Sequence, residues 1–265
     1  MEKTTSETSK NKIKKNVSSE RWVTAQDSEK EYWEEFNTES LLREEGYRHE
    51  KKAEILLKEW SKFIKVNKNI KILQIGCGPE DVINYFSIGK RYAIDPLADF
   101  YTDKFNLSYN SMNFLKARGE EIPFRDKYFD IVILANVLDH VELPEKVLLE
   151  IRRVLKDDGI FHFENLFYQK EFIKIAKIWG KFKEIFTQTI FNIHHPYMFT
   201  FQDLKNLVLG KFSILSEEIG KDIPICNDFE DMKKKKKTDK NIKVRILAYF
   251  GLYGTINYTA ICKKR

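Results

Sequence analysis

The sequence predicts an α/β fold built on a Rossmann-like, mostly parallel sheet with an N-terminal helical cap. Three observations support this prediction. Short β-rich runs alternate with amphipathic segments over residues 68–165, which implies right-handed crossovers and helices on both faces of the sheet. A glycine turn follows the first of these runs, and a β-rich run ends the chain. The length of 265 residues allows one sizeable α/β domain with additions, and is too short for two.

The first 67 residues divide into a tail and a cap. Residues 1–20 are rich in Lys, Ser, Thr and Asn, so a disordered tail without a secretory signal is expected there. Over residues 21–67 apolar residues recur at helical spacing in two stripes, from Trp22 to Phe36 and from Ala53 to Ile64. Two helices are therefore expected to form the cap.

The remainder, residues 68–265, is expected to form the main domain. Strands are predicted at residues 70–75, 91–95, 112–116, 130–134 and 159–164, with helices at 79–86, 97–105 and 144–155 between them. A helical insertion over about 168–200 follows, then a helix at 202–209 and a strand at 212–217. A polar loop over about 220–241 precedes the last strand, 255–262.

The insertion contains an aromatic-rich helix over about residues 170–190. Its apolar stripe consists of Phe172, Ile175, Trp179, Phe182 and Phe186. Such a stripe is more typical of core packing than of a cofactor site, although helices inserted here could also line an acceptor pocket.

The glycine turn joins the first strand to the next helix. Gly76 and Gly78 allow the backbone to bend sharply and approach a ligand, and Pro79 suits a first helical turn. Asp95 closes the second strand, where a carboxylate can accept hydrogen bonds from ribose hydroxyls. The turn therefore predicts a nucleotide site.

The charges next to the glycine turn narrow the choice of nucleotide. A dinucleotide site normally has a third glycine where this chain has Glu80, followed by Asp81. Two carboxylates would repel a pyrophosphate, as in NAD, but tolerate the ammonium and sulfonium groups of S-adenosylmethionine. They also complement a helix dipole, and both explanations can hold together.

The ordered set 72–78, Asp95, 119–124, 129–132 and 153–159 resembles class I S-adenosylmethionine-dependent methyltransferases of the small-molecule type. The resemblance covers about residues 68–165. It implies a seven-stranded sheet with a reversed last strand, helices on both faces, and S-adenosylmethionine as cofactor.

The resemblance also implies the cofactor contacts. Gly76 and Gly78, with Cys77 between them, would line the methionine moiety, Asp95 and Pro96 would meet the ribose, Gly119 and Glu120 would face the adenine, and Asn136 would border the sulfonium. Gln74 could accept a hydrogen bond from the cofactor's ammonium, and Arg48 could pair with its carboxylate. An arginine in such a position is more often a solvated surface residue.

Three positions depart from the family's pattern. Gln74 replaces the usual acid, Glu80 a usual glycine, and Arg118 an aspartate that often precedes the adenine contact. These changes lower the expected cofactor affinity more than they affect the fold.

Two histidines are candidates for the chemistry. Methyl transfer to a hydroxyl needs in-line geometry and a general base. His140 follows the fourth strand and could be that base, or could be a packed histidine at a helix start. His195 could act in catalysis or acceptor binding, or could support a helix entry. The adjacent pair His194 and His195 is poor metal geometry, so no metal site is expected.

The sequence leaves several classes of methyl acceptor as alternatives. Residues 22–26 and 136–141 are similar to segments of methyltransferases of bacterial surface-polysaccharide assembly, which favours O-methylation of a sugar or sugar-bearing precursor. The aromatic helix at 170–190 favours a lipid, quinone or other apolar metabolite instead. Gln74 and Glu80 leave a third possibility, a regulatory or scaffold protein that binds the cofactor without catalysis.

Composition bears on location and partners. The cysteines Cys77, Cys226 and Cys262 are scattered singly, which predicts reduced thiols in a cytoplasmic protein. The net charge of +6 comes largely from blocks such as Lys233 to Lys237, which favour a solvated loop over an anionic partner. No nucleic-acid partner is expected, and the longest apolar run, residues 246–256, is too short for a membrane span.

Overall fold

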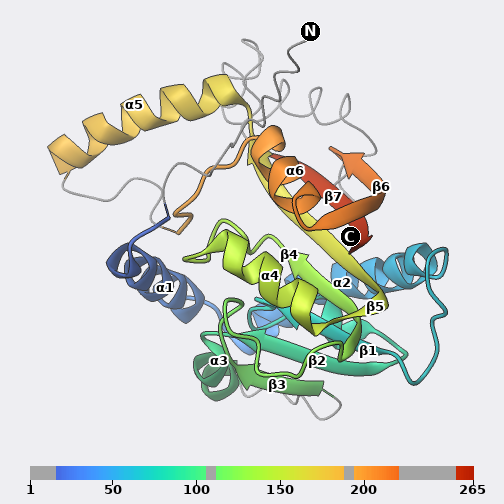
Figure 1. Ribbon diagram of the computed structural model, residues 1–265. Helices are drawn as coiled ribbons and strands as arrows, with labels where there is room; N and C mark the ends of the chain where they lie inside the picture. The colour runs from blue at the N-terminus through green and yellow to red at the C-terminus, as the bar shows by residue number, and fades with distance from the viewer. Residues whose placement is uncertain (1–15, 106–111, 188–193, 221–254) are drawn as a thin grey trace, which may run out of the picture.

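Seven strands form one sheet at the centre of the protein. The structure is a computed structural model, and it describes residues 16–105, 112–187, 194–220 and 255–265. The strands are β1 (Lys71–Ile75), β2 (Lys90–Asp95), β3 (Met112–Lys116), β4 (Phe129–Ala135), β5 (Leu155–Tyr168), β6 (Phe212–Ile219) and β7 (Thr255–Lys264). Their order is β3-β2-β1-β4-β5-β7-β6, and β7 runs antiparallel to both of its neighbours (Figure 1). The predicted sheet with a reversed last strand is confirmed.

Helices cover both faces of this sheet. They are α1 (Ser19–Glu34), α2 (Thr38–Trp60), α3 (Ala98–Phe105), α4 (Pro144–Val154), α5 (Lys170–Thr187) and α6 (Phe201–Leu209), with a short 3₁₀ helix, η1 (Val82–Tyr85). The helices α4 and α6 pack on one face, whereas α2 and η1 pack on the other. Alternate residues of β1 and β4 therefore enter two separate cores, because successive side chains of a strand point to opposite faces.

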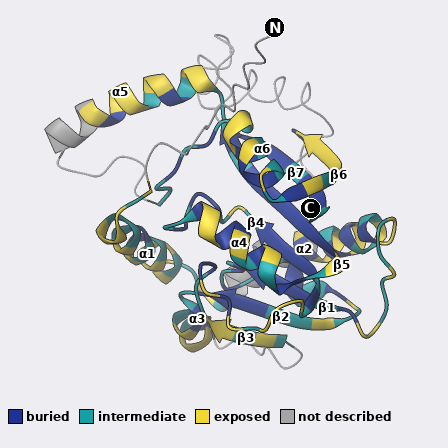
Figure 2. Ribbon diagram, viewed as in Figure 1, coloured by how far each residue is buried: buried dark blue, intermediate teal, exposed yellow. Residues whose placement is uncertain are grey.

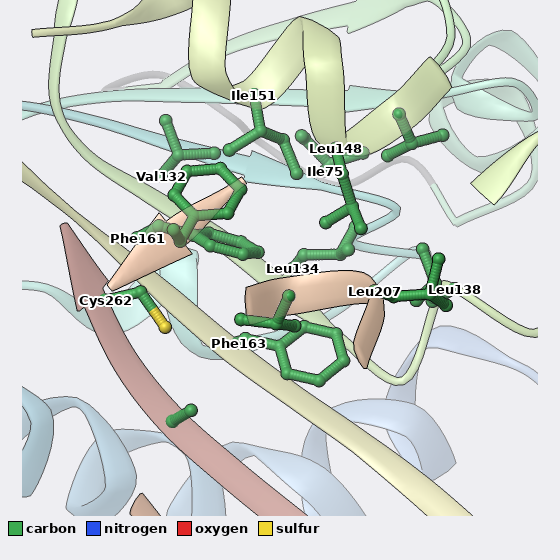
Figure 3. Packing of buried hydrophobic residues seen from close by; sticks show 14 of the residues in the cluster. Ile75, Val132, Leu134, Leu138, Leu148, Ile151, Phe161, Phe163, Leu207 and Cys262 are labelled. Atoms are coloured by element: carbon green, nitrogen blue, oxygen red, sulfur yellow. The ribbon is translucent and has the colours of Figure 1, made fainter. Parts of the chain in front are cut away.

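The larger core lies under α4 and α6. In Figure 3, Leu148 and Ile151 of α4 lie over Val132 and Phe161 of the sheet, and all four side chains are fully buried. Full burial of such a side chain contributes about 1.5–3 kcal/mol. This core fixes β4, and with β4 the loop that carries Asn136 and His140.

The second core joins α2 to the sheet. Leu56 and Trp60 of α2 are buried against Ile72 and Ile131. A buried ion pair, Lys52 to Glu164 at 2.9 Å, lies between the same two layers. Helix α2 is thus a covering helix of the sheet as well as part of the predicted cap.

The N-terminal boundary differs from the prediction. Helix α1 begins at Ser19, capped by the Ser18 side chain, and the backbone N–H of Val17 donates to the hydroxyl of Tyr197 at 2.9 Å. Residues 16–20 are therefore ordered by contacts that the tail's polar composition does not reveal. Residues 1–15 lie outside the described part.

The helix expected at residues 79–86 is reduced to η1. Asp81 caps it by accepting from the N–H of Val82, and the Gln74 side chain accepts from the N–H of Ile83. Pro79 and Glu80 precede the helix as a bend, so the expectation that Pro79 occupies a first helical turn is wrong. The side chains of Asp81 and Gln74 thus accept the hydrogen bonds of backbone N–H groups at the start of this short helix.

The prediction of core packing for the stripe on α5 is also wrong. Ile175 is 51% exposed and Trp179 is 70% exposed. Figure 1 shows the reason: α5 extends outward from the end of β5, past the layers that cover the sheet. The stripe positions Phe182 and Phe186 lie where side chains are not described.

Some predictions fall outside the described residues. These are most of the polar loop at 220–241, the run Lys233 to Lys237, and Cys226. Cys77 and Cys262 are buried free thiols. Within the described ranges, none of the helices combines the length and apolar character that crossing a bilayer requires.

Candidate functional site

A cavity of about 230 Å³ lies at the carboxyl ends of β1, β2 and β4, with α1 along one side. The sequence predicted this edge of the sheet, where the ends of neighbouring parallel strands meet. The lining residues that were predicted to bind the cofactor are Gly76, Cys77, Gly78, Asp95, Pro96, Gly119, Glu120 and Asn136.

The glycine turn has the backbone that its sequence suggested. Gly76 and Gly78 have φ angles of +65° and +59°, in the left-handed region that favours glycine. A Cβ on Gly76 would lie 2.5 Å from the Val137 side chain, whereas a Cβ on Gly78 would meet no atom within 4 Å. Gly76 thus permits close packing, and Gly78 leaves open space for a ligand.

Asp95 stands at the end of β2 with only 7% of its surface exposed. Its carboxylate accepts from the N–H of Gly78 at 3.0 Å and from the N–H of Leu97 at 2.8 Å. Burial raises the pKa of Asp95 to about 6, against the lowering effect of these two amides. The same carboxylate therefore holds the glycine turn and faces the cavity.

The cavity is acidic. Its carboxylates are Glu29, Glu80, Asp81, Asp95 and Glu120, against one guanidinium, that of Arg118. Burial raises the pKa of Glu80, which accepts from the Asn84 side chain. This excess of negative charge suits a ligand with ammonium and sulfonium groups and opposes a pyrophosphate. The lining thus fits S-adenosylmethionine.

The structure does not bring Gln74 or Arg48 to the cavity. Gln74 is fully buried, and its amide donates to Asp81 and accepts from the N–H of Ile83. Asp81, which His49 approaches at 3.5 Å, lines the cavity in its place. Arg48 on α2 is exposed and is not a lining residue. The roles proposed for Gln74 and Arg48 remain predictions without a contact to support them.

Glu120 and Asn136 both line the cavity and are fixed by backbone contacts. Glu120 accepts from the N–H groups of Glu142 and Leu143, at 2.9 and 3.1 Å. Asn136 has a φ of +54°, which is rare outside glycine and is found at functional sites. Its N–H donates to the Glu164 carbonyl at 2.8 Å. No pattern in the sequence indicates this backbone conformation.

Sequence reasoning did not identify the contacts that hold α1 against the cavity. The Arg118 guanidinium lies 4.0 Å from the ring centre of Trp22 and donates to Glu142 at 2.6 Å. Ser19 donates to the same Glu142 carboxylate. Arg118 therefore joins α1 to the sheet, which explains why this position can depart from the usual aspartate.

His140 and His195 lie together beside the cavity. Their ring centres are 4.4 Å apart, and His140 is a lining residue. Nδ1 of His195 lies 2.8 Å from Oδ2 of Asp139, a carboxylate that is 4% exposed and also accepts from Asn165. Asp139 is a site residue that the sequence did not single out, because its partner His195 lies in a loop that is distant in the sequence.

The surroundings of the two imidazoles shift their pKa values in opposite directions. The hydrogen bond to Asp139 raises the pKa of His195, with burial acting against it. Burial lowers the pKa of His140, partly offset by the charge of Asp139. His140 is thereby kept neutral, whereas His195 becomes the stronger base of the pair.

Asp139, His140 and His195 could also hold a metal ion. One ligand atom from each lies within 4.8 Å of the others. The sequence expectation of no metal site considered the adjacent pair His194 and His195 and the spacing of the cysteines, and did not consider Asp139. His194 instead contacts Ser28 of α1, at 3.2 Å.

Residues 73–163 match a family profile described as a methyltransferase domain. A thiol S-methyltransferase of Mus musculus is 32% identical over 104 residues, which are 36% of this chain and 42% of that protein. A ubiquinone/menaquinone biosynthesis C-methyltransferase of Vibrio vulnificus is 30% identical over 100 residues, 34% of this chain and 38% of that protein. The chain thus spans less than half of the length of these curated relatives.

The fold is also that of solved methyltransferases. Geranyl diphosphate C-methyltransferase of Streptomyces coelicolor, solved with S-adenosyl-L-homocysteine, has a TM-score of 0.55 at 12% identity, covering 81% of this chain and 78% of that one. These matches identify residues 73–163 as a methyltransferase domain, and with the strand order, the glycine turn and the acidic cavity they support S-adenosylmethionine as its cofactor.

Proposed function

We propose that this protein O-methylates a sugar or sugar-bearing precursor in the cytoplasm, with His195 as the general base. The observation that carries the proposal is the hydrogen bond between His195 and the buried Asp139, immediately beside the cavity residue His140. A base held in this way suits a hydroxyl acceptor, whose proton must be removed as the oxygen gains a methyl group.

Each residue of the cluster has a defined task. Asp139 accepts the hydrogen bond of His195 Nδ1–H, which leaves Nε2 unprotonated and able to take the acceptor's proton. When bound, S-adenosylmethionine supplies the methyl group from its sulfonium sulfur, which keeps the electron pair and leaves as S-adenosylhomocysteine. The cofactor would be held by Gly76, Gly78 and Asp95. Neutral His140 lines the cavity and would lie between the cofactor and His195.

The sugar acceptor is proposed on a separate observation. It comes from the similarity of residues 22–26 and 136–141 to methyltransferases of surface-polysaccharide assembly. Trp22 of the first segment and Val137 and His140 of the second all line the cavity, so the two segments meet in one place.

The experiment is an acceptor panel. Purified protein is incubated with S-adenosylmethionine and with sugars, nucleotide sugars, thiols and quinone analogues, and release of S-adenosylhomocysteine is measured. We expect release with a hydroxyl-bearing sugar, and release slower by roughly 10²–10⁴-fold after His195→Gln. Turnover of a thiol or quinone alone would contradict the sugar proposal. Activity that requires an added divalent cation and is lost with chelator would instead make Asp139, His140 and His195 a metal site.

An apolar acceptor is the second candidate. It is favoured by the aromatic wall of the cavity, where Trp22, Trp33 and Tyr101 stand, and by the thiol and quinone methyltransferases among the relatives. A thiol ionises more readily than a sugar hydroxyl. Transfer to a thiol should therefore depend less on His195, and the His195→Gln variant distinguishes the two candidates.

A further inference from the structure

Helix α5 presents an apolar stripe to solvent. Ile175, Ile178 and Trp179 are 51%, 66% and 70% exposed, and the last two are the most exposed large hydrophobic residues of the described part of the chain. Their spacing of three and four residues places them on one side of the helix. Figure 2 shows exposed positions recurring along α5 where it leaves the body of the protein. Globular proteins seldom leave such stripes uncovered without an interaction that uses them.

A row of lysines adjoins the stripe. Lys170, Lys174, Lys177 and Lys181 are all exposed. At 100° per residue they lie together along one flank of the stripe, and over residues 170–181 the one acidic residue is Glu171 in the first turn. An apolar stripe with Trp and a lysine flank is the pattern of helices that lie in the surface of a membrane.

We propose that α5 docks this protein onto an anionic lipid surface. The stripe would enter the boundary between headgroups and acyl chains, where Trp is favoured, and the lysines would meet lipid phosphates. Charge decides between this partner and a second copy of the chain. Two α5 helices packed through their stripes would bring two lysine rows together, whereas an anionic bilayer satisfies the stripe and the lysines at once.

The root of α5 lies beside the histidine cluster. Tyr168 ends β5 and its ring stacks on Phe172 of α5, with ring centres 5.7 Å apart. Its backbone N–H donates to Phe199, in the segment that follows His195. Burial and the nearby charge of Asp139 raise the pKa of the Tyr168 phenol. Docking through α5 would therefore bring the acceptor side of the domain close to the lipid surface, although docking itself does not depend on the proposed function.

Vesicle flotation with the full chain tests the proposal. Vesicles of phosphatidylcholine are compared with vesicles that also contain phosphatidylglycerol. We expect the protein to float with the anionic vesicles only, and less so as salt is raised. Ile178→Ser with Trp179→Ser should abolish flotation, and Lys174→Gln with Lys177→Gln should weaken it by roughly fivefold per lysine.

Two controls isolate α5. Leu149→Ser removes a side chain of similar exposure, 54%, on α4, and Lys116→Gln removes an exposed lysine on β3. Both should float as the wild type does. Each variant should bind S-adenosylhomocysteine unchanged, which reports folding and is independent of acceptor chemistry.

Three results would overturn the proposal. One is a wild type that does not float with anionic vesicles at low salt, and another is flotation that both α5 double variants retain. The third is a dimer that Trp179→Ser dissociates in the absence of vesicle binding, which would assign the stripe to a second copy of the chain.

Discussion

The cofactor cavity and the histidine cluster adjoin each other but are built differently. The floor of the cavity lies at the ends of β1, β2 and β4, and two of its carboxylates, Asp95 and Glu120, accept hydrogen bonds from backbone N–H groups. The histidine cluster consists of side chains from two loops, and Asp139 and His195 are 56 residues apart. Its orientation depends on that single buried carboxylate.

This difference separates binding from turnover. Gly76, Gly78 and Asp95 belong to the paired strand ends, so their effects should appear in cofactor affinity. The side chain of His195 is 35% exposed and is hydrogen-bonded to Asp139, so its effects should appear in the chemical step. A variant that changed cofactor affinity and turnover together would contradict this separation.

The largest effect is expected at His195. His195→Gln should lower turnover by roughly 10²–10⁴-fold, because the proton acceptor is lost, and should leave S-adenosylhomocysteine affinity nearly unchanged. His194→Gln is the matched control, since His194 contacts Ser28 and should keep most activity. His140→Gln is measured beside them. Near-normal turnover in both the His195 and His140 variants would show that neither is the base.

Asp95 should control binding. Asp95→Ala is expected to weaken S-adenosylhomocysteine by about 1.5–3 kcal/mol, the range for hydrogen bonds to a charged group. Calorimetric titration well above pH 6 is suitable, because the carboxyl, with a pKa of about 6, is then ionised. Asp95→Asn keeps the shape and serves as the control for folding. Unchanged affinity in Asp95→Ala would place the ribose elsewhere.

The pH profile should identify the base. Only neutral His195 can take a proton, so turnover should fall tenfold per pH unit below its pKa, which Asp139 holds above the usual 6.5. Asp139→Asn removes the charge that raises this pKa, and should move the acid limb of the profile to lower pH. A limb that does not move in Asp139→Asn would mean that another group titrates.

The smallest effect is expected at Arg118. Its contact with Trp22 and its ion pair with Glu142 join α1 to the sheet, and surface contacts of these kinds each contribute about 0.5–1 kcal/mol. Arg118→Ala should release S-adenosylhomocysteine a few-fold faster in stopped-flow measurements, with turnover changed little. Lys116→Gln, two residues earlier at the end of β3, is the control. An equal change in both variants would indicate a general charge effect.

The sequence determined the sheet and the cofactor side of the site. The alternation of strand-forming runs with helical segments predicted the parallel sheet, and the resemblance to methyltransferases predicted its reversed last strand. The two glycines and Asp95 were recognised from their places at predicted strand ends. These features depend on short-range patterns, so they can be recognised from residues close together in the chain. The identification of Glu80 and Asp81 as cavity carboxylates followed from the same short segment.

Only the tertiary structure decided what distant segments do to each other. It brought Asp139 to His195, placed Arg118 on Trp22, turned Gln74 toward Asp81, and left the stripe of α5 in solvent. An apolar stripe with helical spacing has the same sequence whether a core or solvent lies beside it. The stripe is exposed because α5 leaves the end of β5 in a direction that takes it away from the layers covering the sheet.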